Sequence, residues 1–521
     1  MLVSLIISAP ITDCYGFNLL VAQLKKFESR GVEVKLYYIF YDFNKYYSGE
    51  VVEQLVHLCK GSDLIGVSLL SSAYRNSIQI TGALKEGVGC PIIWGGKHPT
   101  AVPEDCLQYA DMVCISEGED TLCELVEKML SGESYDNISG LWIKKNGSII
   151  KNQLRPIENN LDRFVFPDYS LSNKFILDKK SMTIRPMVDN DLAKLRKWYP
   201  TMITRGCPNC CTFCTNSTDF KLRKMRSRSV GSVIKEVKIF VGLHPEVKQV
   251  FFRDDCISAM PIEFIQELSS KWKQKVGLPC SCSGVIATSQ DFRKKMELLT
   301  EGGFTDFKMG IQSGCEKVRR FVYARVGETD AIINSAVKDL HEVCTGRINY
   351  YMITDNPYEK EDELVQSIRF TSRLRRPFSL SLYSLNFYPG TGLFIRAVND
   401  GIIKNKNEAL QESTMVLKDT YLNKVFMILR YFEVPPFFID LLTSKKLYEH
   451  EWFQSVFDVF FRFLFNISTP SRDISKPKIR KVLSDLKWKK KLNLNEFFRW
   501  IVWNPLELIC ICCHRVRQVW N

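Results

Sequence analysis

Long apolar runs are missing from this sequence. No stretch offers about 18 uninterrupted apolar residues, because charged residues interrupt the richest ones at Arg430, Glu433, Asp440, Asp458 and Arg462. We therefore expect no transmembrane helix. The N-terminus also lacks a basic segment followed by a small-residue cleavage site. In a chain of this size, the 18 cysteines fit a reducing cytoplasm better than a disulfide-stabilised secreted fold.

The composition has no sign of disorder, low complexity or a long internal repeat. Hydrophobic residues make up 45% and charged residues 25%, as in folded proteins. A chain of 521 residues is too long for one core and predicts about three domains. The net charge of +13 is partly local, in the runs 221–228 and 476–491. Such runs are usually solvated faces, and contact with an anionic cofactor, nucleic acid or a membrane is the alternative.

The first 135 residues alternate short apolar runs with segments of helical period. This alternation predicts a doubly wound, Rossmann-like α/β domain with a parallel sheet. Ligands of such sheets bind beyond the carboxyl ends of the strands. The loops 8–16, 68–73, 95–100 and 116–120 should therefore form one rim, where small polar residues and glycines suit a cofactor. Ordinary turn chemistry is the alternative for each loop. The predicted strands are Leu2–Ser8, Val34–Tyr38, Leu64–Leu69, Pro91–Trp94 and Met112–Ile115.

Three further regions follow. Residues 136–199 are irregular and rich in proline, with a hairpin-like stretch at 141–150, and we interpret them as a linker. Residues 200–395 again alternate strands and helices, which predicts a partial, TIM-like (βα)6 barrel. Residues 396–521 are expected to be mainly helical. The predicted barrel strands are Met202–Thr204, Val247–Arg253, Cys280–Val285, Phe307–Ile311, Asn349–Thr354 and Leu380–Phe387.

The loop after the first predicted barrel strand carries a C-x3-C-x2-C motif at Cys207, Cys211 and Cys214. Three thiolates on one loop can each hold one iron of a 4Fe-4S cubane, whereas a structural zinc usually takes four ligands. The fourth iron would be free to chelate S-adenosylmethionine (SAM) and to deliver an electron to it. Cys210 leaves a competing C-x2-C-x3-C choice open.

The segment RGCPNCCTFC (205–214) resembles the signature of the radical SAM enzymes, in which an aromatic residue precedes the last cysteine. The segments 251–255, 310–314 and 388–391 resemble later strands of the same barrel. The chain differs from the family pattern at Gln312, where Glu is frequent, and at 354–359, which replaces a Gly-x-Pro-Gly-Glu turn. The resemblance implies a SAM pocket that contains Phe213, Asp254, Asp255, Gln312 and Ser313. Capping of strand ends is the alternative role for the last four.

The segments 95–104 and 116–119 resemble the cobalamin-binding domain that precedes this barrel in one large radical SAM subfamily. With the barrel, the resemblance covers about residues 1–395. The D-x-H-x-x-G motif that supplies a histidine to cobalt in many cobalamin proteins is absent from the sequence, so cobalamin would bind without that ligand. A domain that has lost the cofactor is the alternative. The implied cobalamin pocket contains Ser68, Ser71, Gly95, Gly96, His98, Glu117 and Gly118.

The combined resemblance implies methyl transfer from cobalamin to an unactivated carbon of a small-molecule or lipid-like substrate, with electrons from a donor such as flavodoxin or ferredoxin. Cobalamin-assisted cyclisation, ring contraction or rearrangement is one alternative, and a non-catalytic cobalamin or Fe-S sensor is another. A methylthiotransferase would be expected to carry further N-terminal cluster cysteines. Nucleic acid is not the expected partner. The aromatic, basic C-terminal region suits helices that cap the barrel, a lid for a lipid-like substrate, or peripheral contact with a membrane.

Overall fold

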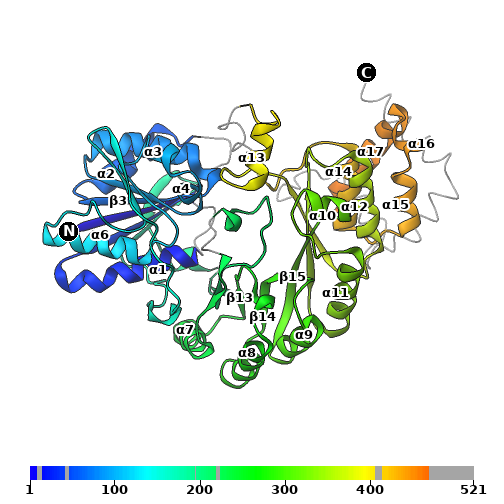
Figure 1. Ribbon diagram of the computed structural model, residues 1–521, viewed down its shortest axis with the longest axis horizontal. Helices are drawn as coiled ribbons and strands as arrows, with labels where there is room; N and C mark the ends of the chain where they lie inside the picture. Colours follow the sequence, from blue (N-terminus) through cyan, green and yellow to red (C-terminus); the bar gives the residue numbers. More distant parts are fainter. Residues whose placement is uncertain (9–13, 41–45, 194, 219–222, 405–413, 469–521) are drawn as a thin grey trace.

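The N-terminal region forms a twisted sheet whose five central strands are parallel (Figure 1). The structure is a computed structural model, which describes residues 1–8, 14–40, 46–193, 195–218, 223–404 and 414–468. The central strands are β1 (Leu2–Ser8), β2 (Glu33–Ile39), β3 (Leu64–Ser68), β4 (Ile92–Gly95) and β5 (Met112–Cys114), in the order β5-β4-β3-β1-β2. Their near-continuous apolar sequences are explained by burial on both faces.

Helices cover both faces of this sheet and create a core on each side. The helices are α1 (Tyr15–Leu24), α2 (Gly49–Cys59), α3 (Tyr74–Gly87) and α6 (Glu119–Ser131), joined by the short α4 (Lys97–Ala101) and α5 (Pro103–Cys106). Val3 and Leu5 point into one core, whereas Ile6 on the same strand points into the other. The predicted doubly wound domain is confirmed.

Residues 136–199 do not form the linker that we predicted, because they supply four strands to the edges of this sheet. The hairpin of β6 (Leu141–Lys145) and β7 (Ser148–Lys151) pairs antiparallel with β5. At the other edge, β8 (Lys174–Asp178) pairs parallel with β2, and β9 (Thr183–Pro186) follows it. The predicted hairpin-like stretch 141–150 corresponds to β6 and β7, whereas β8 and β9 were not predicted, because short edge strands with charged residues lack the apolar pattern of central strands.

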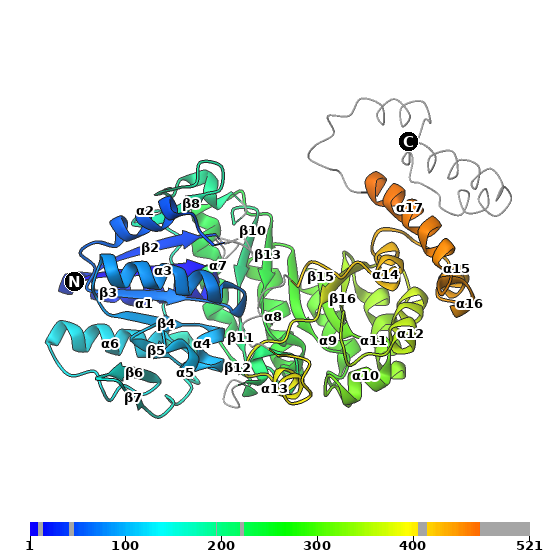
Figure 2. The ribbon, with the colours of Figure 1, turned by 90° about the horizontal axis from the view of Figure 1, so that it is seen from above.

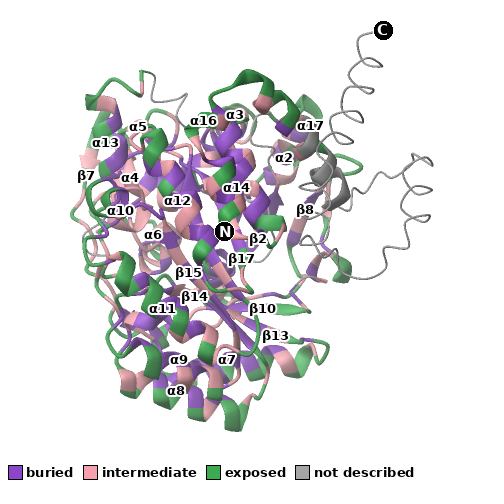
Figure 3. Ribbon diagram, turned by 90° about the vertical axis from the view of Figure 1, so that its right-hand side faces the viewer, coloured by how far each residue is buried: buried purple, intermediate pink, exposed green. Residues whose placement is uncertain are grey.

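The second sheet is an open arc of six parallel strands with helices on its outer side (Figures 1 and 3). The helices are α7 (Val230–Leu243), α8 (Ile262–Lys275), α9 (Phe292–Glu301), α10 (Glu316–Phe321), α11 (Asp330–Val343) and α12 (Glu361–Arg373). This arrangement confirms the predicted partial barrel. The strands in order are β10 (Trp198–Thr201), β13 (Gln249–Phe252), β14 (Cys280–Val285), β15 (Phe304–Gln312), β16 (Ile348–Thr354) and β17 (Ser379–Ser384).

The first barrel strand lies earlier in the chain than predicted. Residues 198–201 pair with β13, whereas the predicted strand 202–204 leaves the sheet. The backbone N–H groups of Ile203 and Thr204 donate to the Asp254 carboxylate instead of to a neighbouring strand. Thr204 then begins a small hairpin of β11 (Thr204–Arg205) and β12 (Arg226–Ser227).

Helices follow the barrel, as predicted for the C-terminal region. They are α13 (Gly392–Asn399), α14 (Tyr421–Tyr431), α15 (Pro436–Leu442), α16 (Lys445–Tyr448) and α17 (Glu451–Ser468). Figure 2 shows α14 to α17 at the end of the barrel far from the N-terminal domain. Residues 469–521, which include the aromatic residues Phe497, Phe498, Trp500 and Trp503, lie outside the described structure. None of the described helices is long and apolar enough to cross a membrane.

The barrel core should depend strongly on Trp272. Its ring is fully buried against Phe252, and its indole N–H donates to the Leu278 carbonyl at 2.9 Å. We expect Trp272→Ala to lower the free energy of unfolding by about 3–5 kcal/mol, because it leaves a large cavity. Ile239→Ala, at a half-exposed position of α7, should change it by less than about 0.5 kcal/mol. Denaturant unfolding measures both, and equal effects would contradict this account of the core.

Candidate functional site

A cavity of about 490 Å³ lies at the carboxyl ends of β1, β3, β4 and β5. Much of its wall is apolar, with Leu5, Ile7 and Leu20 among the lining residues. Five of the seven residues that the sequence placed in a cobalamin pocket line it: Ser68, Gly95, Gly96, Glu117 and Gly118. The cavity therefore occupies the rim expected for the ligand of a doubly wound sheet.

Glycines let neighbouring segments of the cavity wall pack closely against one another. Gly96 has a φ of +106°, and a Cβ atom there would lie 2.8 Å from the Leu69 carbonyl oxygen. A Cβ atom on Gly66 would lie 2.7 Å from the Leu5 side chain. Ser8 lines the same cavity, and its buried hydroxyl has no hydrogen-bond partner among the described residues. A mainly apolar hollow with few polar groups on its wall suits a large, amphiphilic cofactor.

Two of the predicted pocket residues, Ser71 and His98, are not among the residues that line the cavity. His98 is 2% exposed, its Nδ1 lies 3.0 Å from the Ser71 hydroxyl, and its ring packs on Tyr74. Burial lowers the pKa of His98 to about 4, so the ring is neutral at physiological pH. Ser71 and His98 therefore support the loops 68–73 and 95–100 from outside the cavity.

The three predicted cluster cysteines lie on one loop at the mouth of the barrel. Cys211 is buried and Cys207 and Cys214 are half-buried, whereas Cys210 is exposed. Burial raises the pKa of the Cys214 thiol to about 11, and charge on Cys211 and Cys207 adds to the rise. The three thiols are therefore close enough to interact electrostatically. Their arrangement favours the C-x3-C-x2-C set over the set that uses Cys210.

The donor chemistry of this loop suits an iron–sulfur cluster, because each of three thiolates can bind a different iron of a cubane. Arg325 adds a compensating charge, since its Nη1 lies 3.5 Å from the Cys211 sulfur. The same guanidinium donates to Glu328 and to the Gly310 carbonyl, which fixes its position.

Hydrogen bonds to two different parts of the barrel hold the cysteine loop in place. The Thr204 hydroxyl donates to the Asp254 carboxylate at 2.6 Å, just before the loop begins. In the middle of the loop, the Thr212 hydroxyl donates to the Val322 carbonyl at 2.6 Å. The carbonyl of Thr212 in turn accepts from the N–H of Leu393, at the start of α13. These hydrogen bonds hold the loop against the barrel and α13.

The five residues predicted for the SAM pocket occupy different places. Asp255 is exposed at the cavity, and Gln312 ends β15 with a φ of +71°. Phe213 is half-buried, with its ring centroid 5.0 Å from that of Tyr323. Asp254 is buried under the loop, and burial raises its pKa to about 6. Ser313 is fully buried.

The buried Ser313 belongs to a small network behind the barrel mouth. Its hydroxyl donates to the Glu359 carboxyl at 3.1 Å and lies 2.9 Å from the Ser367 hydroxyl. Asp254 and Ser313 therefore support the site instead of facing it, which is the strand-end role that the sequence left open. Phe213, Asp255 and Gln312 are the members of the predicted set at or near the barrel mouth.

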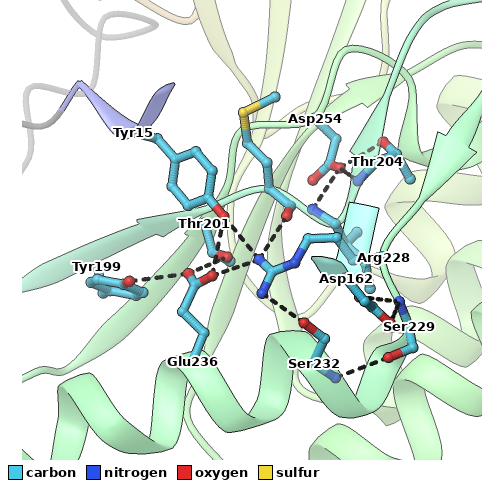
Figure 4. A network of polar contacts seen from close by, with 12 residues as sticks. Tyr15, Asp162, Tyr199, Thr201, Thr204, Arg228, Ser229, Ser232, Glu236 and Asp254 are labelled. Carbon is cyan, nitrogen blue, oxygen red and sulfur yellow. Dashed lines mark hydrogen bonds and ion pairs between the residues drawn. The ribbon is translucent and has the colours of Figure 1, made fainter. Parts of the chain in front are cut away.

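The N-terminal domain is joined to the barrel by a buried polar network (Figure 4). The Glu236 carboxylate accepts hydrogen bonds from Tyr15 of α1 and from Tyr199 and Thr201 of β10. It also forms an ion pair with Arg228. Tyr15 lines the cavity, so this network connects the cavity wall to the first strand of the barrel.

Family models match both halves of this arrangement. The B12 binding domain model matches residues 12–126, which include most of the cavity wall. The Radical SAM superfamily model matches residues 201–371, which include the cysteine loop and most of the barrel. The chain is a radical SAM enzyme with an N-terminal B12-binding domain. The cofactors of this radical SAM enzyme are a 4Fe-4S cluster, SAM and cobalamin.

Relatives and solved structures agree with this assignment. The radical SAM enzyme is 26% identical over 400 residues to an uncharacterized methyltransferase of Pyrococcus horikoshii, covering 75% of this chain and 82% of the relative. It shares its fold with the radical SAM methyltransferase TsrM of Kitasatospora setae, solved with tryptophan and a SAM analogue (TM-score 0.61, 15% identity, 77% and 76% coverage). It also shares the fold of the radical SAM enzyme OxsB, solved with aqua-cobalamin and SAM (TM-score 0.60, 17% identity, 93% and 74% coverage).

Several site residues of this radical SAM enzyme were not assigned to a pocket from the sequence. Met202, Arg205, Asn216 and Arg226 line the cavity from the barrel side. Arg205 stands inside the RGCPNCCTFC segment, so its proximity to the cysteines was visible, but its partners were not. Arg325 lies 114 positions from the cysteine that it faces, and only the fold brings the two together.

The network behind the barrel mouth predicts a pH dependence of stability. Burial raises the pKa of Glu359 from 4.5 to about 7, so the folded protein favours the neutral carboxyl. Its contribution to stability is present below about pH 4.5 and is lost as the pH rises through about 7. We expect Glu359→Gln to remove this decline, so that the thermal midpoint of the variant gains on wild type between pH 5 and 8. The exposed Glu263→Gln is the control and should follow wild type. Parallel profiles of thermal midpoint against pH for Glu359→Gln and wild type would contradict the raised pKa of Glu359.

Proposed function

We propose that this enzyme is a cobalamin-dependent radical SAM methyltransferase that methylates an unactivated carbon of a small molecule. One observation supports this most directly: the cavity of the B12-binding domain opens onto the cysteine loop. Its wall includes Gly206, next to Cys207, as well as Asn216 and Asp255 of the barrel. A methyl carrier and a radical source can cooperate only if the substrate carbon reaches both, so adjacent sites are required.

The proposal assigns Cys207, Cys211 and Cys214 as cluster ligands. When bound, the cluster and SAM supply a one-electron route to a 5′-deoxyadenosyl radical, and cobalamin supplies a carrier for the methyl group. The residues of the chain hold these groups in place and exclude water. Arg325 balances the thiolate charge at Cys211, and Asp254 fixes the start of the loop. Lys97 of the B12-binding domain donates to Asn216 of the barrel at 2.6 Å, which closes the rim between the domains.

The relatives support methyl transfer over rearrangement. The Pyrococcus horikoshii relative is named a methyltransferase, and TsrM is a methyltransferase solved with tryptophan. A small organic molecule is therefore the substrate class that we propose. Reductive cleavage of SAM also needs an electron. We propose a low-potential donor of the flavodoxin or ferredoxin type.

A test of this function compares the three ligand cysteines with Cys210. The protein is reconstituted anaerobically with iron, sulfide and hydroxocobalamin, then given dithionite and SAM with a deuterated methyl group. Cys207→Ala, Cys211→Ala and Cys214→Ala should each lower the yield of 5′-deoxyadenosine by at least about a hundredfold, because the cluster loses a ligand. Cys210→Ala, on the same loop but exposed, should retain most of the yield.

The label then distinguishes methyl transfer from its alternatives. Deuterated methyl in a small-molecule product supports the proposal, whereas an unlabelled, rearranged product indicates cyclisation or ring contraction. A wild-type protein that binds both cofactors but never cleaves SAM, with any reductant or candidate substrate tried, would indicate a sensor.

Exposed apolar side chains on the C-terminal helices support a second proposal, that this end contacts an anionic membrane surface. Phe437 and Leu441 of α15 are 66% and 49% exposed, and Trp452 of α17 is 63% exposed. Residues 469–521, which lie outside the described structure, contain twelve Lys and Arg but four Asp and Glu. Apolar and aromatic residues beside basic charge suit an interface with anionic lipids.

Vesicle sedimentation tests this contact. Wild type should bind vesicles that contain phosphatidylglycerol more tightly than neutral phosphatidylcholine vesicles. The double variant Phe437→Ser, Trp452→Ser should bind them at least about tenfold more weakly, because each buried aromatic side chain contributes about 1.5–3 kcal/mol. Leu243→Ser, which removes an exposed apolar side chain of α7, is the matched control and should bind like wild type. Equal binding by all three proteins would show that α15 and α17 do not make this contact.

A further inference from the structure

Two arginines stand at the base of the cysteine loop, on the small hairpin that precedes and follows it. Arg205 of β11 lies opposite Arg226 of β12 in the antiparallel register. Cys207 comes two residues after Arg205, and the Gly206 between them has a φ of +97°. The position of this hairpin therefore sets where the first cluster cysteine begins.

Both arginines are held by carboxylates of the B12-binding domain. Arg226 makes a two-pronged contact with Glu117, with N–O distances of 2.9 and 2.7 Å. Arg205 lies 3.1 Å from Glu117 and donates to Glu119 at 2.6 Å. Glu117 lies in the loop after β5, and Glu119 begins α6. The hairpin is thus tied to a different domain, 86 positions away in the Arg205–Glu119 pair.

These ion pairs are mostly shielded from water. The side chain of Arg226 is 2% exposed and that of Glu119 is 8% exposed, and Arg205 and Glu117 are each at most one-fifth exposed. Two positive and two negative charges balance one another. Breaking one pair would leave a buried charge without its partner, which is strongly unfavourable. The cluster is therefore a rigid connection between the domains.

All four side chains also line the cobalamin cavity, together with Gly206 and Gly118. A cofactor that fills the cavity displaces water from these same charges, which strengthens their attraction. The group that contacts the cofactor is therefore also the group that positions the strand before Cys207.

We propose that Arg205 is a positioning residue that couples occupancy of the cobalamin cavity to binding of the cluster. Cobalamin stabilises the Arg205–Glu119 and Arg226–Glu117 pairs, and these pairs hold the hairpin in the position in which the thiolates bind iron. By thermodynamic reciprocity, the cluster must then raise the affinity for cobalamin by the same factor by which cobalamin raises the affinity for the cluster.

The test is a binding cycle that needs no substrate and no turnover. The dissociation constant of hydroxocobalamin is measured anaerobically on the full chain, once without the cluster and once after reconstitution. In wild type we expect the cluster to tighten cobalamin binding by at least about fivefold. Cobalamin should likewise slow the loss of iron to a chelator.

Two variants separate coupling from a general loss of structure. The ratio to compare is the dissociation constant of hydroxocobalamin without the cluster divided by that with the cluster. In Glu119→Gln and in Arg205→Lys this ratio should fall toward one, even if both constants rise. Because a purely structural defect at the cavity weakens both constants alike, it leaves the ratio unchanged. Asp120→Asn is the matched control, since Asp120 pairs with Arg163, 2.8 Å away, and not with the hairpin. This control should keep the wild-type ratio.

A wild-type ratio of one would overturn the proposal, and so would an unchanged ratio in both Glu119→Gln and Arg205→Lys. Neither result would affect the proposed methyl transfer, because the cycle measures binding only.

Discussion

The buried Glu236 carboxylate is the interaction on which the arrangement of the two domains depends. It lies on α7 and is satisfied by Arg228 and by three hydroxyl groups, from Tyr15, Tyr199 and Thr201. A buried charge is stable only when its partners are complete. Those partners come from the first domain, from the first barrel strand and from the segment after the cysteine loop. One charge thus connects the cavity, the barrel and the loop.

Two neighbouring acidic residues just beyond the end of β13 have different tasks, because one is buried and the other is exposed. Asp254 is buried and accepts the N–H groups of Ile203 and Thr204, whereas the next residue, Asp255, is exposed at the cavity. The same contrast separates Gln312, at the end of β15, from the fully buried Ser313. A family motif identifies such pairs, but the local backbone decides which member faces the ligand and which one holds the loop.

The sequence predicted the central strands well and the edges poorly, for a physical reason. The strands Leu2–Ser8 and Cys280–Val285 were predicted with their observed bounds, since a buried parallel strand is marked by its own composition. At the edges, the predicted hairpin-like stretch 141–150 corresponds to β6 and β7, but β8 and β9 were missed, because they are short, partly charged and defined by their pairing partners. The cysteine spacing was equally local and visible. The partners of Arg205, Arg325 and Glu236 were not, because these contacts join residues that are far apart in the chain.

The late completion of the first sheet matters for how this protein is made. The outer strands β8 and β9 reach the sheet only when the chain has extended to Pro186, well beyond the span 12–126 that the B12-binding family model matches. A fragment cut at the end of that span would expose the open edges of β2 and β5. Unpaired edges invite association with other chains. During synthesis, the nascent domain has to remain in this vulnerable form until the second hairpin leaves the ribosome.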